Sequence, residues 1–120
     1  MKKKILVVDD FKNSLAVLKM TLEIKNYEVT TASNGQEALA LFSTQKFDLL
    51  ISDFNMPIMN GLELTKMIKS MALYRSFPII IVSTEIDENK KKEAFQAGVT
   101  YWLKKPFKMD EFVKVIEKVI

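Results

Sequence analysis

Short apolar runs alternate with amphipathic stretches along the whole chain. The runs are rich in Val, Ile, Leu, Thr and aromatic residues, and they are bounded by polar residues, Gly or Pro. Continuous apolar runs of this kind are typical of strands covered on both faces, as in a parallel sheet. The pattern predicts strands over residues 5–8, 28–32, 49–52, 78–82 and 101–103.

The stretches between the runs place apolar residues at the spacing of one helix face. Leu15, Leu18 and Leu22 are separated by three and four residues, a period that indicates an amphipathic helix. The same period predicts further helices over three sets of residues: Ala38, Leu39, Leu41 and Phe42; Leu64, Met67, Ile68 and Met71; and Phe112, Val115, Ile116 and Val119.

Local signals predict where two helices begin and end. Ser33 and Gln36 have the spacing of a capping box, which begins a helix. Asp87 or Glu88 begins another helix, and Gly98 ends it because Gly readily takes the left-handed conformation after a last helical turn. Five strands alternating with five helices predict an α/β fold with a doubly wound parallel sheet. No repeat or linker interrupts this alternation, so residues 1–120 are expected to form a single domain.

The composition excludes several classes of chemistry. The chain has no Cys and no His, which excludes disulfides, thiolate metal sites, a Ser-His-Asp triad and a zinc hydrolase site. The net charge of +3, from 18 basic and 15 acidic residues, is too small and scattered to indicate nucleic-acid binding. The first apolar run is too short for a signal peptide or a membrane span. We therefore expect a cytoplasmic protein that binds neither nucleic acid nor membrane.

The conspicuous polar residues stand at the ends of the predicted strands. Asp9 and Asp10 follow the first strand, Asp53 the third, Ser83 the fourth, and Lys105 the fifth. In open parallel sheets, ligands bind beyond the carboxyl ends of the strands. Three carboxylates within about 5 Å of one another repel unless a cation lies between them. A hard cation with oxygen ligands, Mg²⁺, suits a site that lacks Cys and His.

This set of residues is suited to forming an aspartyl phosphate. A carboxylate nucleophile beside a metal that keeps positions for phosphate oxygens has the parts that this chemistry needs. The Lys105 ammonium can neutralise phosphoryl oxygens, and the Ser83 hydroxyl can donate to one of them. The site holds no base to activate a hydroxyl group. The phosphoryl donor is therefore expected to arrive already activated, for example as a phosphorylated histidine on another protein.

The segments that carry these residues resemble the receiver domains of two-component response regulators, and most of all the stand-alone chemotaxis regulators of that family. The matching segments are ILVVDDF at 5–11, SDFNMP at 52–57, MNGLEL at 59–64, AG at 97–98 and KPF at 105–107. They follow the family's order over nearly the entire chain. The resemblance implies one receiver domain over residues 1–120, with a flavodoxin-like (βα)5 fold and strand order 2-1-3-4-5.

The resemblance also implies roles for individual residues. Asp53 is implied as the phosphoacceptor, and Lys105 is implied to pair with the phosphoryl group. The peptide bond between Lys105 and Pro106 is expected to be cis. The implied Mg²⁺ ligands are Asp9, Asp10, Asp53 and the backbone carbonyl of Asn55. The implied hydroxyl and aromatic switch residues are Ser83 and Trp102, and the positions that tune dephosphorylation are Asn55, Thr84 and Glu85. Thr84 departs from the Ala or Gly usual in the family, and Trp102 is bulkier than the usual Tyr or Phe.

The implied function is a phosphorylation-activated signalling module, not an enzyme, that dephosphorylates itself. Its implied partners are a sensor histidine kinase or histidine phosphotransfer protein, a downstream protein such as a flagellar motor switch component, and a phosphatase. Because the chain ends with the last predicted helix, we expect a stand-alone, monomeric regulator in chemotaxis. A phosphorelay intermediate and a receiver domain excised from a larger regulator stay open as alternatives.

Two other functions are disfavoured by particular residues. A phosphatase with an aspartate nucleophile needs a second acid two residues later, where this chain has Asn55, which cannot protonate a leaving group. A flavin-binding electron carrier of the same fold needs a phosphate-cradling loop after the first strand. Asp9 and Asp10 stand there instead and would repel the phosphate.

Overall fold

The computed structural model describes residues 2–120 and contains one five-stranded parallel sheet. The strands run in the order β2-β1-β3-β4-β5, with every neighbouring pair parallel. This order confirms the predicted flavodoxin-like, doubly wound fold. The strands are β1 (Lys4–Val8), β2 (Glu28–Ala32), β3 (Leu49–Asp53), β4 (Ile79–Ser83) and β5 (Tyr101–Lys104).

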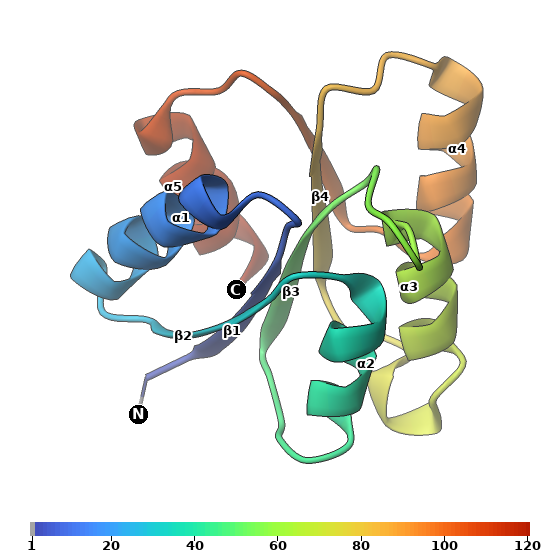
Figure 1. Ribbon diagram of the computed structural model, residues 1–120, viewed down its shortest axis with the longest axis horizontal. Helices are drawn as coiled ribbons and strands as arrows, with labels where there is room; N and C mark the ends of the chain where they lie inside the picture. The colour runs from blue at the N-terminus through green and yellow to red at the C-terminus, as the bar shows by residue number, and fades with distance from the viewer. Residues whose placement is uncertain (1) are drawn as a thin grey trace.

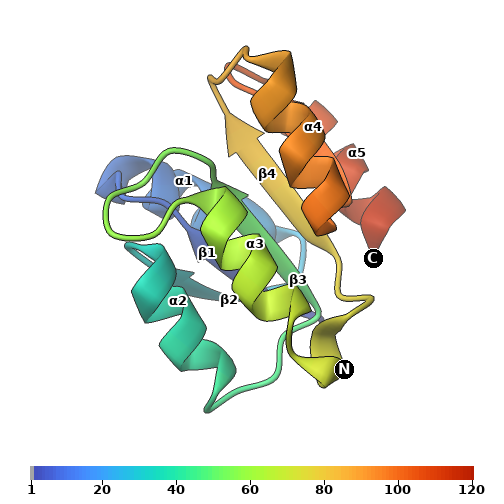
Figure 2. The same cartoon turned by 90° about the vertical axis from the view of Figure 1, so that its right-hand side faces the viewer.

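Helices cover both faces of the sheet. The pair α1 and α5 lies on one face, and α2, α3 and α4 lie on the other (Figures 1 and 2). Their bounds are α1 (Lys12–Ile24), α2 (Gly35–Phe42), α3 (Gly61–Lys69), α4 (Glu88–Ala97) and α5 (Met109–Val119), and a short 3₁₀ helix, η1 (Ala72–Tyr74), precedes β4. None of the helices described between residues 2 and 120 has the length and apolar character to cross a membrane.

The two faces of the sheet are packed by separate apolar clusters. Successive side chains of a strand point to opposite faces, so Leu6 and Leu50 pack with α2, α3 and α4, whereas Ile5 and Leu49 pack with α1 and α5. All four of these side chains are fully buried. Burial on both faces explains why the strands read as continuous apolar runs in the sequence.

The helix ends agree with the sequence signals except at α2. Gly98 follows α4 with a φ of 114°, the left-handed conformation that Gly adopts without a steric penalty. The predicted capping box of Ser33 with Gln36 is wrong by one residue. Asn34 is the cap, and its side chain accepts the Glu37 N–H at 2.8 Å. The Ser33 hydroxyl instead donates to the Glu37 carboxylate, because the chain enters the helix one residue later than predicted.

Candidate functional site

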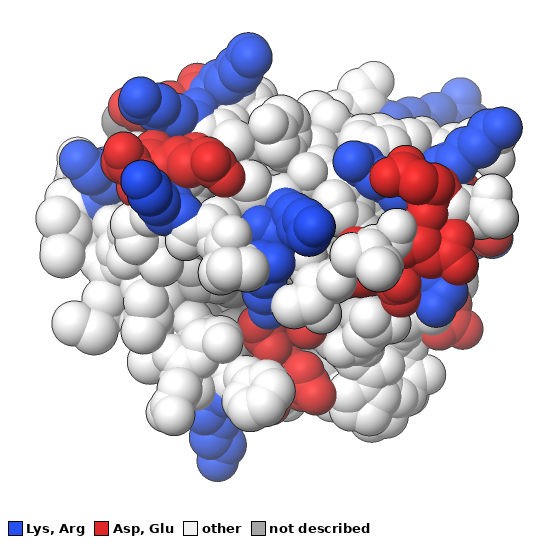
Figure 3. All heavy atoms as spheres, turned by 90° about the horizontal axis from the view of Figure 1, so that it is seen from above, with Lys and Arg blue, Asp and Glu red and all other residues white. Residues whose placement is uncertain are grey.

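Acidic and basic side chains converge at the carboxyl edge of the sheet. Asp9 and Asp10 directly follow β1, Asp53 ends β3, and Lys105 directly follows β5. The parallel order places β1 beside β3 and β3 beside β4, so these residues emerge at one edge. Viewed down onto this edge, acidic side chains and a lysine lie in the middle of the surface and uncharged side chains surround them (Figure 3).

The three acids form one cluster. One carboxylate oxygen from each of Asp9, Asp10 and Asp53 lies within 4.8 Å of the others. Asp9 is buried, with 1% of its surface exposed, whereas Asp10 is exposed. The Asp9 carboxylate accepts the backbone N–H of Phe11 at 3.0 Å. Three hard oxygen donors this close together fit a divalent cation of the Mg²⁺ type.

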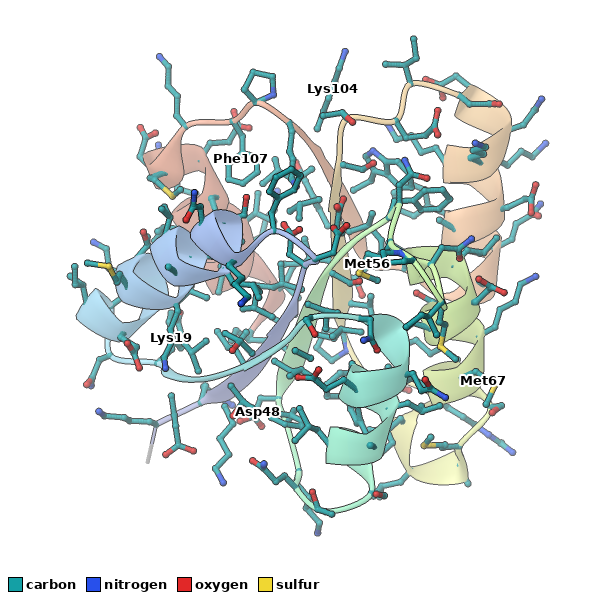
Figure 4. All side chains as sticks on the ribbon, in the orientation of Figure 1. Lys19, Asp48, Met56, Met67, Lys104 and Phe107 are labelled. Carbon is teal, nitrogen blue, oxygen red and sulfur yellow. The ribbon has the colours of Figure 1, made fainter. Side chains whose placement is uncertain are left out.

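Lys105 provides the positive charge inside this cluster. Its Nζ lies 3.4 Å from Asp9 Oδ2 and 3.8 Å from Asp53 Oδ1. Its backbone N–H donates to the Ser83 carbonyl at 2.8 Å, and its peptide bond to Pro106 is cis. The adjacent Lys104 points away from the sheet (Figure 4). Within the described residues, Lys105 is therefore the ammonium group that reaches the acids.

The surroundings of Asp53 raise the pKa of its carboxyl group to about 6. Partial burial is the main cause, and the negative charges of Asp9 and Asp10 add to it. Lys105 and the Phe54 N–H, which donates to Asp53 Oδ1 at 2.9 Å, act in the opposite direction. A carboxylate with this pKa is mostly ionised at pH 7 and is more basic than an ordinary one, as a nucleophile requires.

A pocket of about 420 Å³ opens above this cluster. The described residues that line it are Asp10, Phe11, Ser14, Asp53, Asn55, Thr84 and Lys105. Asn55 and Thr84 therefore line the same pocket as Asp53. Thr84, which directly follows β4, is one of the lining residues.

Ser83 and Glu85 lie beside the pocket and not in its lining. Ser83 is fully buried, and its Oγ accepts the Glu85 N–H at 3.0 Å. The Glu85 carboxylate lies 3.1 Å from Lys90 Nζ and accepts the backbone N–H groups of Ile86 and Asp87. The hydrogen bond from Lys90 is the main cause of a lowered pKa at Glu85. These contacts hold the loop between β4 and α4 against its own helix.

Trp102, on β5, is buried on the sheet face that α2, α3 and α4 cover, opposite the face that α1 covers. Its ring is 7% exposed, and its centre lies 5.1 Å from the centre of the Phe54 ring. Phe54, Phe11 and Ser14 are site residues for which no role was predicted from the sequence. The backbone N–H of Phe54 donates to Asp53, and that of Phe11 donates to Asp9. Aspartate side chains often accept a backbone N–H one or two residues later, so these positions could have indicated both contacts from the sequence. Ser14 carried no signal of its own.

Known proteins similar to this chain are response regulators. The family model described as "Response regulator receiver domain" matches residues 5–117. The chain is 33% identical to the chemotaxis protein CheY of Pseudomonas aeruginosa, covering 97% of this chain and 94% of that one. The solved structure of Vibrio cholerae chemotaxis protein CheY4 is 38% identical, covers 100% of both chains and superposes with a TM-score of 0.95.

Longer regulators match as well. The chain is 37% identical to the alkaline phosphatase synthesis transcriptional regulatory protein PhoP of Bacillus subtilis, and the match covers 89% of this chain but 44% of PhoP. The chain therefore spans less than half of that relative and nearly all of the chemotaxis proteins.

Proposed function

Because the chain belongs to the response regulator receiver domain family, we propose that residues 1–120 act as a single receiver domain that accepts a phosphoryl group on Asp53. The observation that carries this proposal is the convergence of Asp53, Asp9, Asp10 and Lys105 at the carboxyl edge of the sheet, where Asp10, Asp53 and Lys105 line one pocket. Phosphorylation signalling follows from family membership. The particular acceptor, ligands and partners are the parts that we propose.

The transfer step needs few groups from the protein. A carboxylate oxygen of Asp53 attacks the phosphorus of an activated donor and forms a new P–O bond. The bond between phosphorus and the leaving group breaks, and the leaving group departs with the electron pair; a leaving imidazole takes its proton from solvent. Lys105, 3.8 Å from Asp53, neutralises charge that develops on the equatorial phosphoryl oxygens.

The acid cluster suits Mg²⁺ as a cofactor. Asp9, Asp10, Asp53 and the Asn55 carbonyl would hold the ion, which would supply charge neutralisation for the phosphoryl oxygens when bound. The fit rests on three hard oxygen donors within 4.8 Å. Among residues 2–120, Lys105 is the one ammonium group that reaches them, so the cluster keeps a net negative charge.

The residues around the pocket would set the lifetime and output of the phosphorylated state. We assign Ser83 and Trp102 as the hydroxyl and aromatic switch residues, and Asn55, Thr84 and Glu85 as residues that tune dephosphorylation. Asn55 and Thr84 line the pocket and so stand where a hydrolytic water would approach. Self-dephosphorylation belongs to this proposal.

The phosphoryl donor would be a histidine kinase or histidine phosphotransfer protein, and a downstream protein would read the phosphorylated form. Chemotaxis is the proposed setting, because the chain matches chemotaxis proteins over nearly their whole length. A phosphorelay intermediate or the receiver part of a longer regulator is the second candidate, since PhoP matches over 44% of its length. A cytoplasmic location is part of the same proposal.

The test is incubation with Mg²⁺ and acetyl phosphate, followed by intact mass measurement. The wild-type chain should gain one phosphoryl group that is labile at alkaline pH, and Asp53→Asn should gain none. Asp48→Asn is the matched control, because Asp48 is an exposed acid at the other edge of the sheet (Figure 4), and it should be phosphorylated like wild type. An unmodified wild-type chain, or a modified Asp53→Asn chain, would contradict the proposal.

A further inference from the structure

Phe54 contacts both the candidate phosphoacceptor and Trp102. Its backbone N–H donates to Asp53 Oδ1 at 2.9 Å. Its ring, 3% exposed, packs against the Trp102 ring with a distance of 5.1 Å between centres and an angle of 48° between planes. One residue thus bridges the end of β3 and the middle of β5.

The peptide groups around Phe54 are held tightly. The Phe54 carbonyl accepts the Gly61 N–H at 2.8 Å, and the Asp53 carbonyl accepts the Ser52 hydroxyl at 2.8 Å. A Cβ at Gly61 would lie 2.7 Å from the Asp53 carbonyl oxygen, so the start of α3 is pressed against this segment. The hydrogen bond from the Phe54 N–H to the Asp53 side chain is the contact in this segment that phosphorylation would alter directly.

Phosphorylation of Asp53 would weaken that contact. One Asp53 oxygen becomes bonded to phosphorus and the other becomes a neutral carbonyl oxygen, so the Phe54 N–H loses its anionic acceptor. Hydrogen bonds to an ionised acceptor are roughly twice as strong as neutral ones. Because close-packed interiors transmit small displacements, a shift of the Phe54 backbone would reach the Trp102 ring.

Trp102 is buried in the same apolar cluster as Phe54. With 7% of its surface exposed, the ring has little room for a large inward rotation. Its contact with the Phe54 ring, 5.1 Å between centres, is therefore the contact through which a small displacement would reach it. On the same strand, Tyr101 is 36% exposed and Lys104 is exposed, so a shift of β5 would change the surface beside it.

We propose that Phe54 is a positioning residue that transmits the phosphorylation state of Asp53 to Trp102 through its backbone N–H and its ring. This inference rests on the proposed function and adds a route to it. The route runs through packing between β3 and β5, in addition to any movement of the Ser83 hydroxyl.

The experiment uses the fluorescence of Trp102, which is the single tryptophan of the chain. Emission is recorded before and after phosphorylation with acetyl phosphate and Mg²⁺, and intact mass measures the phosphorylated fraction in the same samples. Wild type should change its emission on phosphorylation. In Phe54→Leu the change should fall by at least about twofold at equal phosphorylated fraction, and in Phe54→Tyr, which keeps the ring, it should be retained.

Phe77→Leu is the matched control. Phe77 is 8% exposed and belongs to the same apolar cluster, but its ring packs against Phe42 and Tyr74. This variant should respond like wild type. Should Phe54→Leu not fold, Phe54→Met takes its place.

The outcomes separate the two proposals. A wild-type chain that gains no phosphoryl group overturns the proposed function. A chain that is phosphorylated without a change in Trp102 emission overturns only the inference about Phe54. An undiminished response in Phe54→Leu, or an equal loss in Phe77→Leu, also overturns that inference.

Discussion

The two edges of the sheet are built from different kinds of residue. The carboxyl edge holds a buried aspartate, Asp9, beside Asp53 and Lys105. The amino edge of β3 and β4 holds four aromatic rings, those of Phe42, Phe47, Tyr74 and Phe77, with T-shaped contacts at 5.1 to 5.4 Å between centres. The same strands therefore connect a charged edge to an apolar one.

The aromatic rings at one edge stabilise the fold, whereas the charged residues at the other edge form the candidate site. Buried rings remove large apolar areas from water, and edge-to-face pairs add to that gain. Partial burial, with the neighbouring carboxylates adding to it, raises the pKa of Asp53, so the fold disfavours its charged form. The aromatic edge thus stabilises a domain whose other edge gathers the charged residues of the candidate site.

Removing the central ring of the aromatic edge should have the largest effect. Phe42 contacts the other three rings and is 6% exposed. Phe42→Ala should lower the free energy of unfolding by about 3–5 kcal/mol, as measured by urea denaturation. Phe11→Ala is the control, because this ring at the carboxyl edge is 70% exposed and its loss should cost less than about 0.5 kcal/mol. Equal losses would remove the distinction between the edges.

Neutralising Asp53 should stabilise the domain at neutral pH. The folded-state pKa of about 6 exceeds the ordinary value of 3.8, so the folded state binds more protons than the unfolded state between these values. Stability of the wild type should therefore fall as pH rises from about 4 through 6.

In metal-free buffer, Asp53→Asn should be more stable than wild type by on the order of 2 kcal/mol near pH 7.5, with little difference near pH 4. Denaturation at both pH values measures this. Asp48→Asn serves as control, since Asp48 accepts the Lys4 N–H at 2.8 Å at an exposed position, and it should not stabilise the chain. An Asp53→Asn variant that is less stable near pH 7.5 would contradict the argument that burial and neighbouring charges disfavour the ionised Asp53 carboxylate.

Magnesium ions should relieve the repulsion at the carboxyl edge. A ligand that binds only the folded state stabilises it by about 1.4 kcal/mol at ten times its Kd, so the Tm of wild type should rise when Mg²⁺ is added. Asp10→Asn removes the exposed acid of the cluster and should reduce that rise. An equal rise in both proteins would count against Asp10 as a ligand.

The smallest effect is expected from the exposed ion pair at the amino edge. Lys4 Nζ lies 3.4 Å from Glu28, and about half of each side chain is exposed (46% and 55%). Glu28→Gln should change the free energy of unfolding by less than about 0.5 kcal/mol. A larger loss would mean that charge also matters for stability at the aromatic edge.

Much of the fold was predictable because burial on two faces leaves a clear pattern. The strand at 28–32 was predicted with its observed bounds, and the strand at 5–8 lacked only Lys4. The start of α2 was missed by one residue because Ser33 and Asn34 are both good caps, and the choice depends on how the chain leaves β2. At the site, the positions at strand ends predicted that Asp9, Asp10 and Asp53 share one edge of the sheet, and the strand order implied by the family resemblance placed them side by side, as they are found.

The sequence by itself determined the succession of strands and helices along the chain and the edge at which the acids emerge, since both follow from hydrophobic period and chain direction. Only the tertiary structure decided that Trp102 is buried against Phe54, and that Ser83 lies beside the pocket and not in its lining. Such details depend on contacts between residues far apart in the chain and on competition among several hydrogen-bond partners. A local sequence pattern therefore cannot predict which of these contacts form.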